Sequence, residues 1–195
     1  MLRHIFIIIF ILFAFVSVFH LEDVSSAEDY GWLQSAGWRI IDSDHCTVML
    51  HPDVNLEKVN KKVNVRFHSL DNGAFSPKYK SIESQIGEKV DRIFKKVERV
   101  LDMYPNKIHL NIKIFRTQAQ LDEEYGKIFG HNDGVLRISY YIHKYTTIFT
   151  TELAIREGIL AHEMGHAIAD HYFLVSPSER IKELLAQYAE IHLEE

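Results

Sequence analysis

The clearest helical pattern in the chain covers residues 78–104. Hydrophobic residues recur there at steps of three and four, at Ile82, Ile86, Val90, Ile93, Val97, Val100, Leu101 and Tyr104. The positions between them are mainly Lys, Glu, Arg and Asp, so this stretch is predicted to be an amphipathic helix with one solvated face. Pro105 and Asn106 mark its end.

Alternation of apolar and polar residues predicts strands on both sides of this helix. The alternating stretches are residues 45–51, 63–67 and 107–114. In the last of these, Ile108, Leu110, Ile112 and Ile114 alternate with Lys107, His109, Asn111 and Lys113, which predicts a half-exposed strand. Residues 135–150 are rich in Ile, Tyr, Thr and Phe and predict one or two further strands.

Local signals predict four more helices. Residues 55–62 form a short one, and Thr117 with Gln120 forms a capping box that opens a helix to about Phe129. A helix follows from about Thr151, and a last one begins near Pro177 or Ser178. This order predicts an α+β fold, in which a small, mostly antiparallel sheet packs beside the long helix and the final helix pair.

Composition agrees with a globular protein. The chain has 195 residues, of which 47% are hydrophobic, 12% aromatic and 25% charged, values typical of one folded domain. The formal net charge of -5 and the absence of a basic cluster argue against a nucleic-acid partner.

The first residues predict export. Arg3 precedes an apolar run over residues 5–19, interrupted only by Ser17. The run is shorter than the roughly 20 residues that a spanning helix needs. Because Ser25 and Ala27 are small residues at the -3 and -1 positions of a cleavage site, we predict a signal peptide over 1–27 and one periplasmic or secreted domain over 28–195. The alternative is an uncleaved anchor, which would be the only membrane association.

The stretch with the most specific chemistry reads His162-Glu163-Met164-Gly165-His166. Residues four apart share a helix face, so both imidazoles can point at one ion, and Glu163 can reach the water beside it. Hydrophobic residues surround the pair: Ile159, Leu160, Ala161, Met164, Ala167, Ile168 and Ala169. Two buried imidazoles and a carboxylate are costly without partners, and a metal ion supplies one.

A catalytic zinc takes three protein ligands and keeps one position for water. Glu183 is the predicted third ligand, with Glu179 and Glu190 as rivals. Predicted acceptors for the histidine N–H groups are Asp170, Gln187 and Glu190. Lone Cys46 has no internal disulfide partner and is interpreted as a small buried residue on a strand.

These residues resemble the gluzincin branch of the zincin metallopeptidases, in particular the compact peptidase MA-like domains. Glu183-Leu184-Leu185-Ala186-Gln187-Tyr188 is similar to the family stretch that carries the third ligand, although Leu184 stands where Gly is usual. The resemblance implies a zincin-like fold, Zn²⁺ held by His162, His166 and Glu183, and Glu163 as general base. It also implies that an edge strand within residues 135–143 binds an extended peptide. The metzincin pattern fails, because Ala169 and Tyr172 stand where it needs Gly and His.

The hypothesis is therefore a zinc-dependent peptidase that acts on peptide or protein substrates. The alternative is an inactive or latent zincin-fold binding or scaffold protein of the cell envelope, and the presence of Glu163 favours the enzyme. The oxyanion-stabilising donor stays open among Tyr188, Tyr172, His171, Tyr140, Tyr141 and Tyr145. Packing is the favoured interpretation of Tyr188.

Overall fold

The computed structural model describes residues 37–64, 80–131 and 133–193. The chain divides after residue 35, and every described residue belongs to the unit formed by residues 36–195. The predicted signal peptide lies outside the described residues, as do residues 65–67 of the strand predicted at 63–67. Val63, at the start of that prediction, is the C-cap of a helix and not part of a strand. Within the described part, no helix combines the length and the apolar character that crossing a membrane requires.

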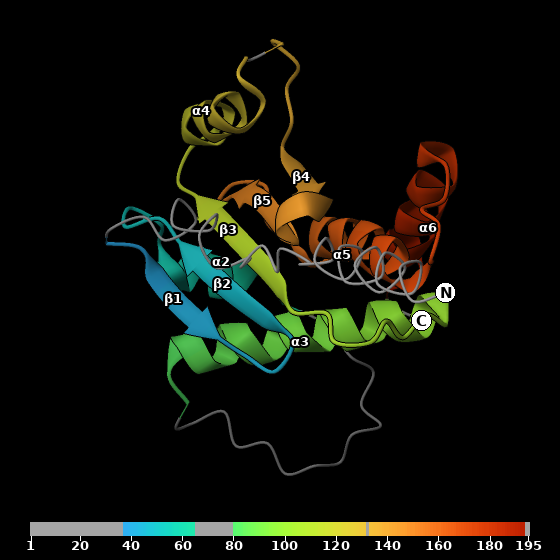
Figure 1. The fold of residues 1–195 in the computed structure, drawn as a ribbon. Helices are drawn as coiled ribbons and strands as arrows, with labels where there is room; N and C mark the ends of the chain where they lie inside the picture. Colours follow the sequence, from blue (N-terminus) through green and yellow to red (C-terminus); the bar gives the residue numbers. More distant parts are fainter. Residues whose placement is uncertain (1–36, 65–79, 132, 194–195) are drawn as a thin grey trace, which may run out of the picture. The chain divides into compact units, whose positions relative to one another are not determined.

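A five-stranded sheet organises the described residues (Figure 1). Its strands are β1 (Arg39–Asp42), β2 (Cys46–Leu50), β3 (Leu110–Phe115), β4 (Ser139–Ile142) and β5 (Thr147–Thr151), in the order β1-β2-β3-β5-β4. The pairs β1/β2 and β4/β5 are antiparallel, whereas β2/β3 and β3/β5 are parallel. The prediction of a mostly antiparallel sheet is therefore wrong. The connections from β2 to β3 and from β3 to β5 contain helices. They are long enough for the second strand of each pair to run in the same direction as the first.

The helices are α2 (Leu56–Lys62), α3 (Ile82–Leu101), α4 (Gln118–Phe129), α5 (Glu157–Tyr172) and α6 (Glu179–Ile191). The coarse prediction of an α+β protein is confirmed. The capping box of Thr117 and Gln120 is present at the start of α4. Helix α3 ends three residues before the predicted Tyr104, because Asp102 takes a left-handed conformation with φ of 52° and its N–H bonds back to the last turn.

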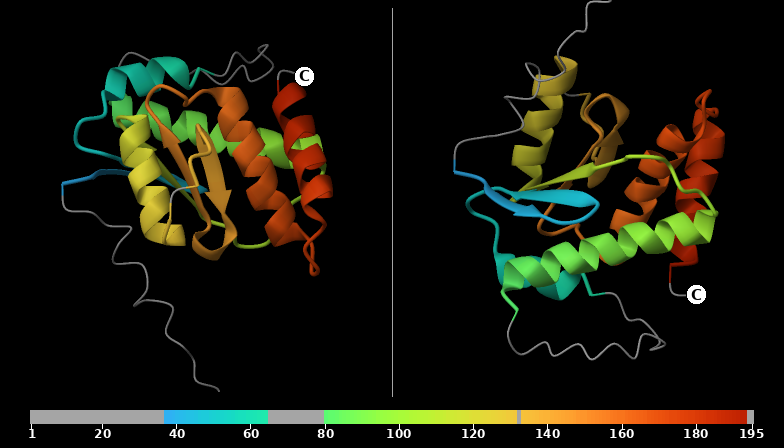
Figure 2. Two further views of the ribbon diagram at one scale, coloured as in Figure 1. Left: turned by 90° about the horizontal axis from the view of Figure 1, so that it is seen from above. Right: turned by 60° about the horizontal axis from the view of Figure 1, so that its bottom comes forward.

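Two helical layers cover the two faces of the sheet (Figures 1 and 2). Alternate residues of β3, such as Ile112 and Ile114, join the main core with side chains from α3 and α5. The residue between them, Lys113, points to the opposite face and contacts Glu124 of α4. Helix α4 therefore lies on one face of the sheet, and α3 and α5 lie on the other.

The interpretation of β3 as half-exposed is wrong. Lys113 is only 1% exposed, because α4 covers the face that the lysine pattern assigned to solvent. Its ammonium lies 2.5 Å from Glu124 and 4.9 Å from the ring centre of Trp38. Burial lowers the pKa of Lys113, and the bond to Glu124 opposes this shift. Lys113 can be buried in the central strand of the sheet because its ammonium has a carboxylate and an aromatic ring as partners.

Helix α5 begins at Glu157 and not near Thr151, where the sequence placed it. Strand β5 continues to Thr151 because the backbone of Glu152 donates to Phe115 O at 2.7 Å and so extends the pairing with β3. The Glu152 side chain then contacts Arg116 and accepts the backbone N–H of Asn55 at 2.7 Å. These bonds fix the turn that leads into α5 and hence the position of the helix that carries the histidine pair.

Candidate metal centre

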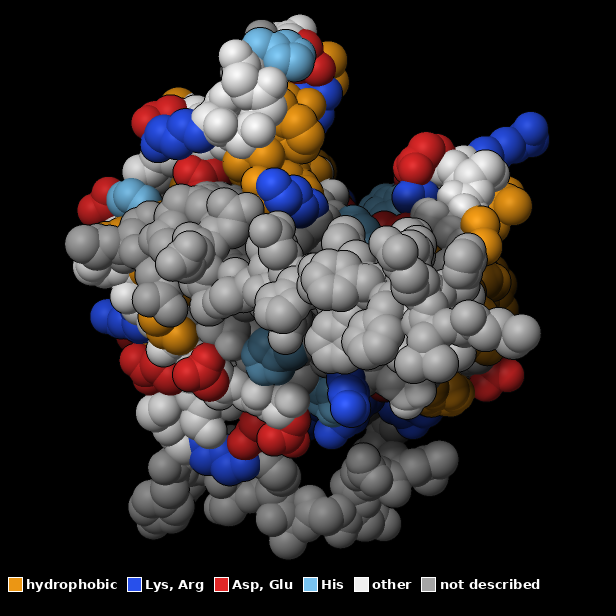
Figure 3. Space-filling model, in the orientation of Figure 1, with side chains coloured by type: hydrophobic (Ala, Val, Ile, Leu, Met, Phe, Trp, Pro, Cys, Tyr) orange, Lys and Arg blue, Asp and Glu red, His pale blue; other side chains and the backbone are white. Residues whose placement is uncertain are grey.

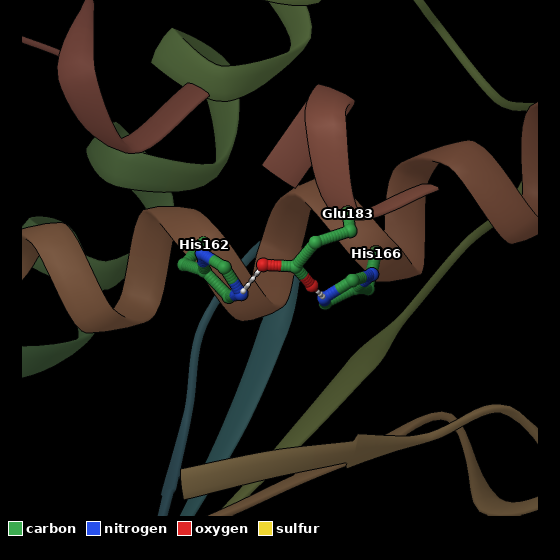
Figure 4. Close-up of side chains that lie close together, drawn as sticks. All are labelled: His162, His166 and Glu183. Carbon is green, nitrogen blue, oxygen red and sulfur yellow. Dashed lines mark ion pairs between the residues drawn. The ribbon is translucent and has the colours of Figure 1, made fainter. Parts of the chain in front are cut away.

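His162 and His166 lie one turn apart on the same side of α5. Their ring centres are 5.0 Å apart with an interplanar angle of 75°. Each side chain is 21% exposed, so the rings are half-buried at the surface of the sheet-and-helix core. Figure 4 shows a ring nitrogen of each histidine turned toward the space between the two rings. The four-residue spacing produces the arrangement expected for two ligands of one ion.

Glu183 of α6 reaches between these rings (Figure 4). One carboxylate oxygen lies 3.7 Å from His162 Nε2 and the other lies 3.5 Å from His166 Nε2. One donor atom from each of the three residues lies within 4.8 Å of the other two. Ligands at about 2.0–2.2 Å from a tetrahedral zinc are roughly 3.4 Å apart, so the three donors fit such an ion with small side-chain adjustments.

Gly165 allows α6 to come this close to α5. A Cβ at this position would lie 2.8 Å from the Cα of Ala186, closer than real side chains approach a backbone atom. Ala186 is itself fully buried and lies three residues after Glu183. The glycine inside the motif therefore has a packing role. It brings the helix with Glu183 against the helix with the histidine pair.

Glu163 is the least exposed of the acidic side chains in the site, at 6%. Burial raises the pKa of its carboxyl to about 7, and the nearby negative charges of Glu183 and Glu190 add to the rise. Ser139 and the backbone of Tyr141 lie close to the carboxylate and oppose this rise, and the Ser139 hydroxyl donates to Phe149 O at 3.1 Å. Both residues belong to β4, which lies at one edge of the sheet that the described strands form. Glu163 therefore lies beside an edge strand of the sheet, on the helix that carries the histidine pair.

Two residues of α6 support the ligands from behind. Glu190 Oε2 lies 3.2 Å from His162 Nδ1, so the carboxylate can accept the Nδ1 proton and leave Nε2 free to bind a metal. Gln187 donates its amide to Glu183 Oε1 at 2.9 Å. Burial is the main cause that lowers the pKa of His166, and the neighbouring His162 adds to it. A lowered pKa favours the neutral imidazole, the form that ligates metals.

The remaining candidates lie elsewhere. Asp170 contacts Lys182 at 3.3 Å and Ser176 at 3.2 Å, so its carboxylate connects the end of α5 to α6. Glu179, a rival third ligand, pairs with the same Lys182 at 2.7 Å. The other rival, Glu190, contacts the far nitrogen of His162. Of the three candidates for the third ligand, Glu179, Glu183 and Glu190, only Glu183 lies within reach of both Nε2 atoms.

The tyrosine candidates for an oxyanion donor do not lie together, and two of them lie on opposite faces of the sheet. Tyr140 packs against Tyr125 of α4, on the side of the sheet opposite α5. Tyr188 is 48% exposed and stacks on His192 with ring centres 3.9 Å apart. Tyr141 faces α5, and its hydroxyl lies 3.3 Å from Nε2 of His171. The two other tyrosines lie at the exposed last residue of α5 (Tyr172) and in the short helix η2 (His143–Tyr145).

Ser139 and the Tyr141 backbone are the groups beside Glu163 that the sequence did not predict. The predicted edge strand within residues 135–143 includes both, but no local pattern indicated which of its groups would face Glu163. Figure 3 shows the surface hollowed between the side chains over α4 and the segment before β4 and those over α6.

In comparisons with protein-family models, curated proteins and solved structures, nothing matches this chain.

Proposed function

We propose that this protein is a zinc-dependent peptidase with a zincin-like fold. The observation that carries the proposal is the convergence of His162, His166 and Glu183 beside a buried Glu163. The three donor side chains match a zinc site that has one position open. A zinc ion bound there supplies Lewis-acid chemistry, which polarises a scissile carbonyl and activates water.

The chain's own residues account for the proton transfers. Glu163 accepts a proton from the attacking water and returns it to the leaving amine. Ser139 and the backbone of Tyr141 orient the carboxylate from the edge strand. Glu190 and Gln187 orient His162 and Glu183. Each group therefore keeps its position before substrate arrives, and such preorganisation lowers the cost of reaching the transition state.

Strand β4 supports a peptide as the substrate class. Among the described strands it pairs with β5 alone, and it contacts the candidate site through Ser139 and Tyr141. A peptide in extended conformation can add to such an edge through main-chain hydrogen bonds. The scissile bond would then lie beside Glu163 and the histidine pair.

The test combines zinc content with hydrolysis of casein or a quenched peptide library. We expect about one zinc per chain by elemental analysis, retained by an inactive Glu163→Gln variant and lost by Glu183→Ala. Glu179→Ala is the matched control, because Glu179 is on the same helix and pairs with Lys182. Zinc without hydrolysis of any peptide would favour the alternative, a zincin-fold protein that binds metal and does no chemistry. Folded protein without zinc would overturn the site.

A further inference from the structure

Helix α6 and the turn before it expose six large hydrophobic side chains. In the turn, Leu174 is 105% exposed and Val175 is 84% exposed. We name the whole set the α6 outer surface, and it consists of Phe173, Leu174, Val175, Ile181, Leu184 and Ile191. Large exposed apolar patches of this kind mark contacts with proteins or membranes.

These residues do not serve the protein core. The face of α6 that packs on α5 uses small side chains instead, Ala186 and Ala189, which are both fully buried. The outer positions Ile181, Leu184 and Ile191 follow at steps of three and seven and fall on another side of the helix. Helix α6 therefore has one apolar face that is buried against α5 and a second apolar face that is exposed. The exposed face can be buried only against an external partner.

The position of the turn favours a lipid surface over a groove on another protein. Both views in Figure 2 show this turn at the end of the α5–α6 helix pair. Leu174 and Val175 project there with almost no contact to the rest of the chain. Exposed Arg180 follows within the next turn, and a cation beside inserted apolar side chains can contact lipid phosphates.

The sequence before the described residues supports the same occupant. The apolar run over residues 5–19 follows Arg3 and brings the chain to a membrane, as a signal or as an anchor. If that run stays in the bilayer, residues 20–36 can span at most roughly 60 Å, which keeps the described unit near the lipid. A weak contact then becomes effective, because the tether supplies a high local concentration of lipid.

We propose that the α6 outer surface binds the surface of a lipid bilayer, with Leu174 and Val175 inserted below the headgroups. The proposal is independent of the proposed peptidase activity. If both hold, α6 also carries Glu183, so lipid contact keeps the candidate site close to the membrane and favours polypeptides that lie on it.

The test places a fluorophore on the turn of the full chain. Cys46 is fully buried, so Leu174→Cys provides the accessible thiol for an environment-sensitive dye. The labelled protein is mixed with vesicles of phosphatidylcholine and phosphatidylglycerol that carry nitroxide groups on their acyl chains. We expect blue-shifted emission and quenching by the nitroxides. Adding Val175→Asp is expected to remove most of the quenching, because a carboxylate is costly below the headgroups.

The matched control is Glu123→Cys, an exposed position on α4, which should show neither effect. Residues 5–19 can attach the full chain to vesicles by themselves, so the position of the dye and not the bound fraction is the decisive readout. Bound protein whose dye at position 174 stays unquenched would overturn the proposal, as would a chain that does not bind vesicles. A concentration-dependent blue shift without lipid would assign the surface to a second copy instead.

Discussion

At the scale of single residues, the site is defined by how each carboxylate is surrounded. Glu163 is buried against β4, Glu183 reaches both Nε2 atoms, and Glu190 contacts the far nitrogen of His162. Three acids on two helices therefore have three different neighbours, which is what distinct roles as base, ligand and orienting group require. The bond from Glu190 to His162 is the part of this scheme that a single substitution can test.

We predict that Glu190→Ala weakens zinc binding about 10–100-fold without removing a ligand. The carboxylate fixes the tautomer and the ring orientation of His162, and an alanine leaves both free to change. The measurement is a competition titration against a chromophoric zinc chelator. Glu179→Ala changes the same residue type on the same helix and should bind zinc like the unmodified protein. Equal affinities for the two variants would count against an orienting role for Glu190.

At the scale of elements, the contact between α5 and α6 depends on small residues. We predict that Gly165→Ala lowers the free energy of unfolding by about 1–3 kcal/mol, because the new Cβ meets the backbone of α6 at Ala186. The same displacement moves Glu183 away from the histidine pair, so zinc affinity should fall as well. Urea unfolding and the chelator titration measure the two effects.

Gly126→Ala is the matched control for this prediction. Gly126 lies within α4, and a Cβ there would have no neighbour within 4 Å. Alanine is the better helix former, so this variant should be more stable by about 0.5–1 kcal/mol. If Gly165→Ala behaved in the same way, the close approach of the two helices would not depend on the glycine.

Elements whose signals are local could be predicted from the sequence. Helix α3 has a regular apolar stripe, and α4 has its capping box, so the central parts of both predictions are confirmed. Strand β1 has only four residues and one buried side chain, and it was missed. The parallel pairing of β3 with β2 and β5 depends on crossovers that periodicity does not encode.

The same distinction applies to the candidate site. The histidine spacing lies within one helix, so the sequence alone indicated that both rings share a face. Glu163 of α5 lies beside Ser139 of an edge strand about two dozen residues earlier in the sequence. Only the tertiary fold brings these two residues together. The alternation around Lys113 correctly predicts a strand. The pattern cannot show that α4 covers the face of the strand on which Lys113 lies, because that contact is tertiary.

At the scale of the whole molecule, the candidate ligands join two helices that follow the sheet in sequence. His162 and His166 belong to α5 and Glu183 belongs to α6, so an ion bound by all three would connect these helices directly. A ligand that binds the folded state and not the unfolded chain stabilises the fold by mass action. Zinc should therefore act as a structural link as well as a catalytic group.

We predict that zinc at 100 times its dissociation constant adds about 2.7 kcal/mol to the stability of chelator-treated protein. For a folded unit of this size, such a gain raises the midpoint of thermal unfolding by roughly 5–10 °C, which calorimetry can measure. The chain has 12 histidines, so unfolded chains also bind zinc to some extent. His166→Ala removes the site and leaves the other histidines in place, so the difference between the two proteins reports the contribution of the site. The same rise in both proteins would show that zinc stabilises the chain elsewhere and would contradict a site shared by α5 and α6.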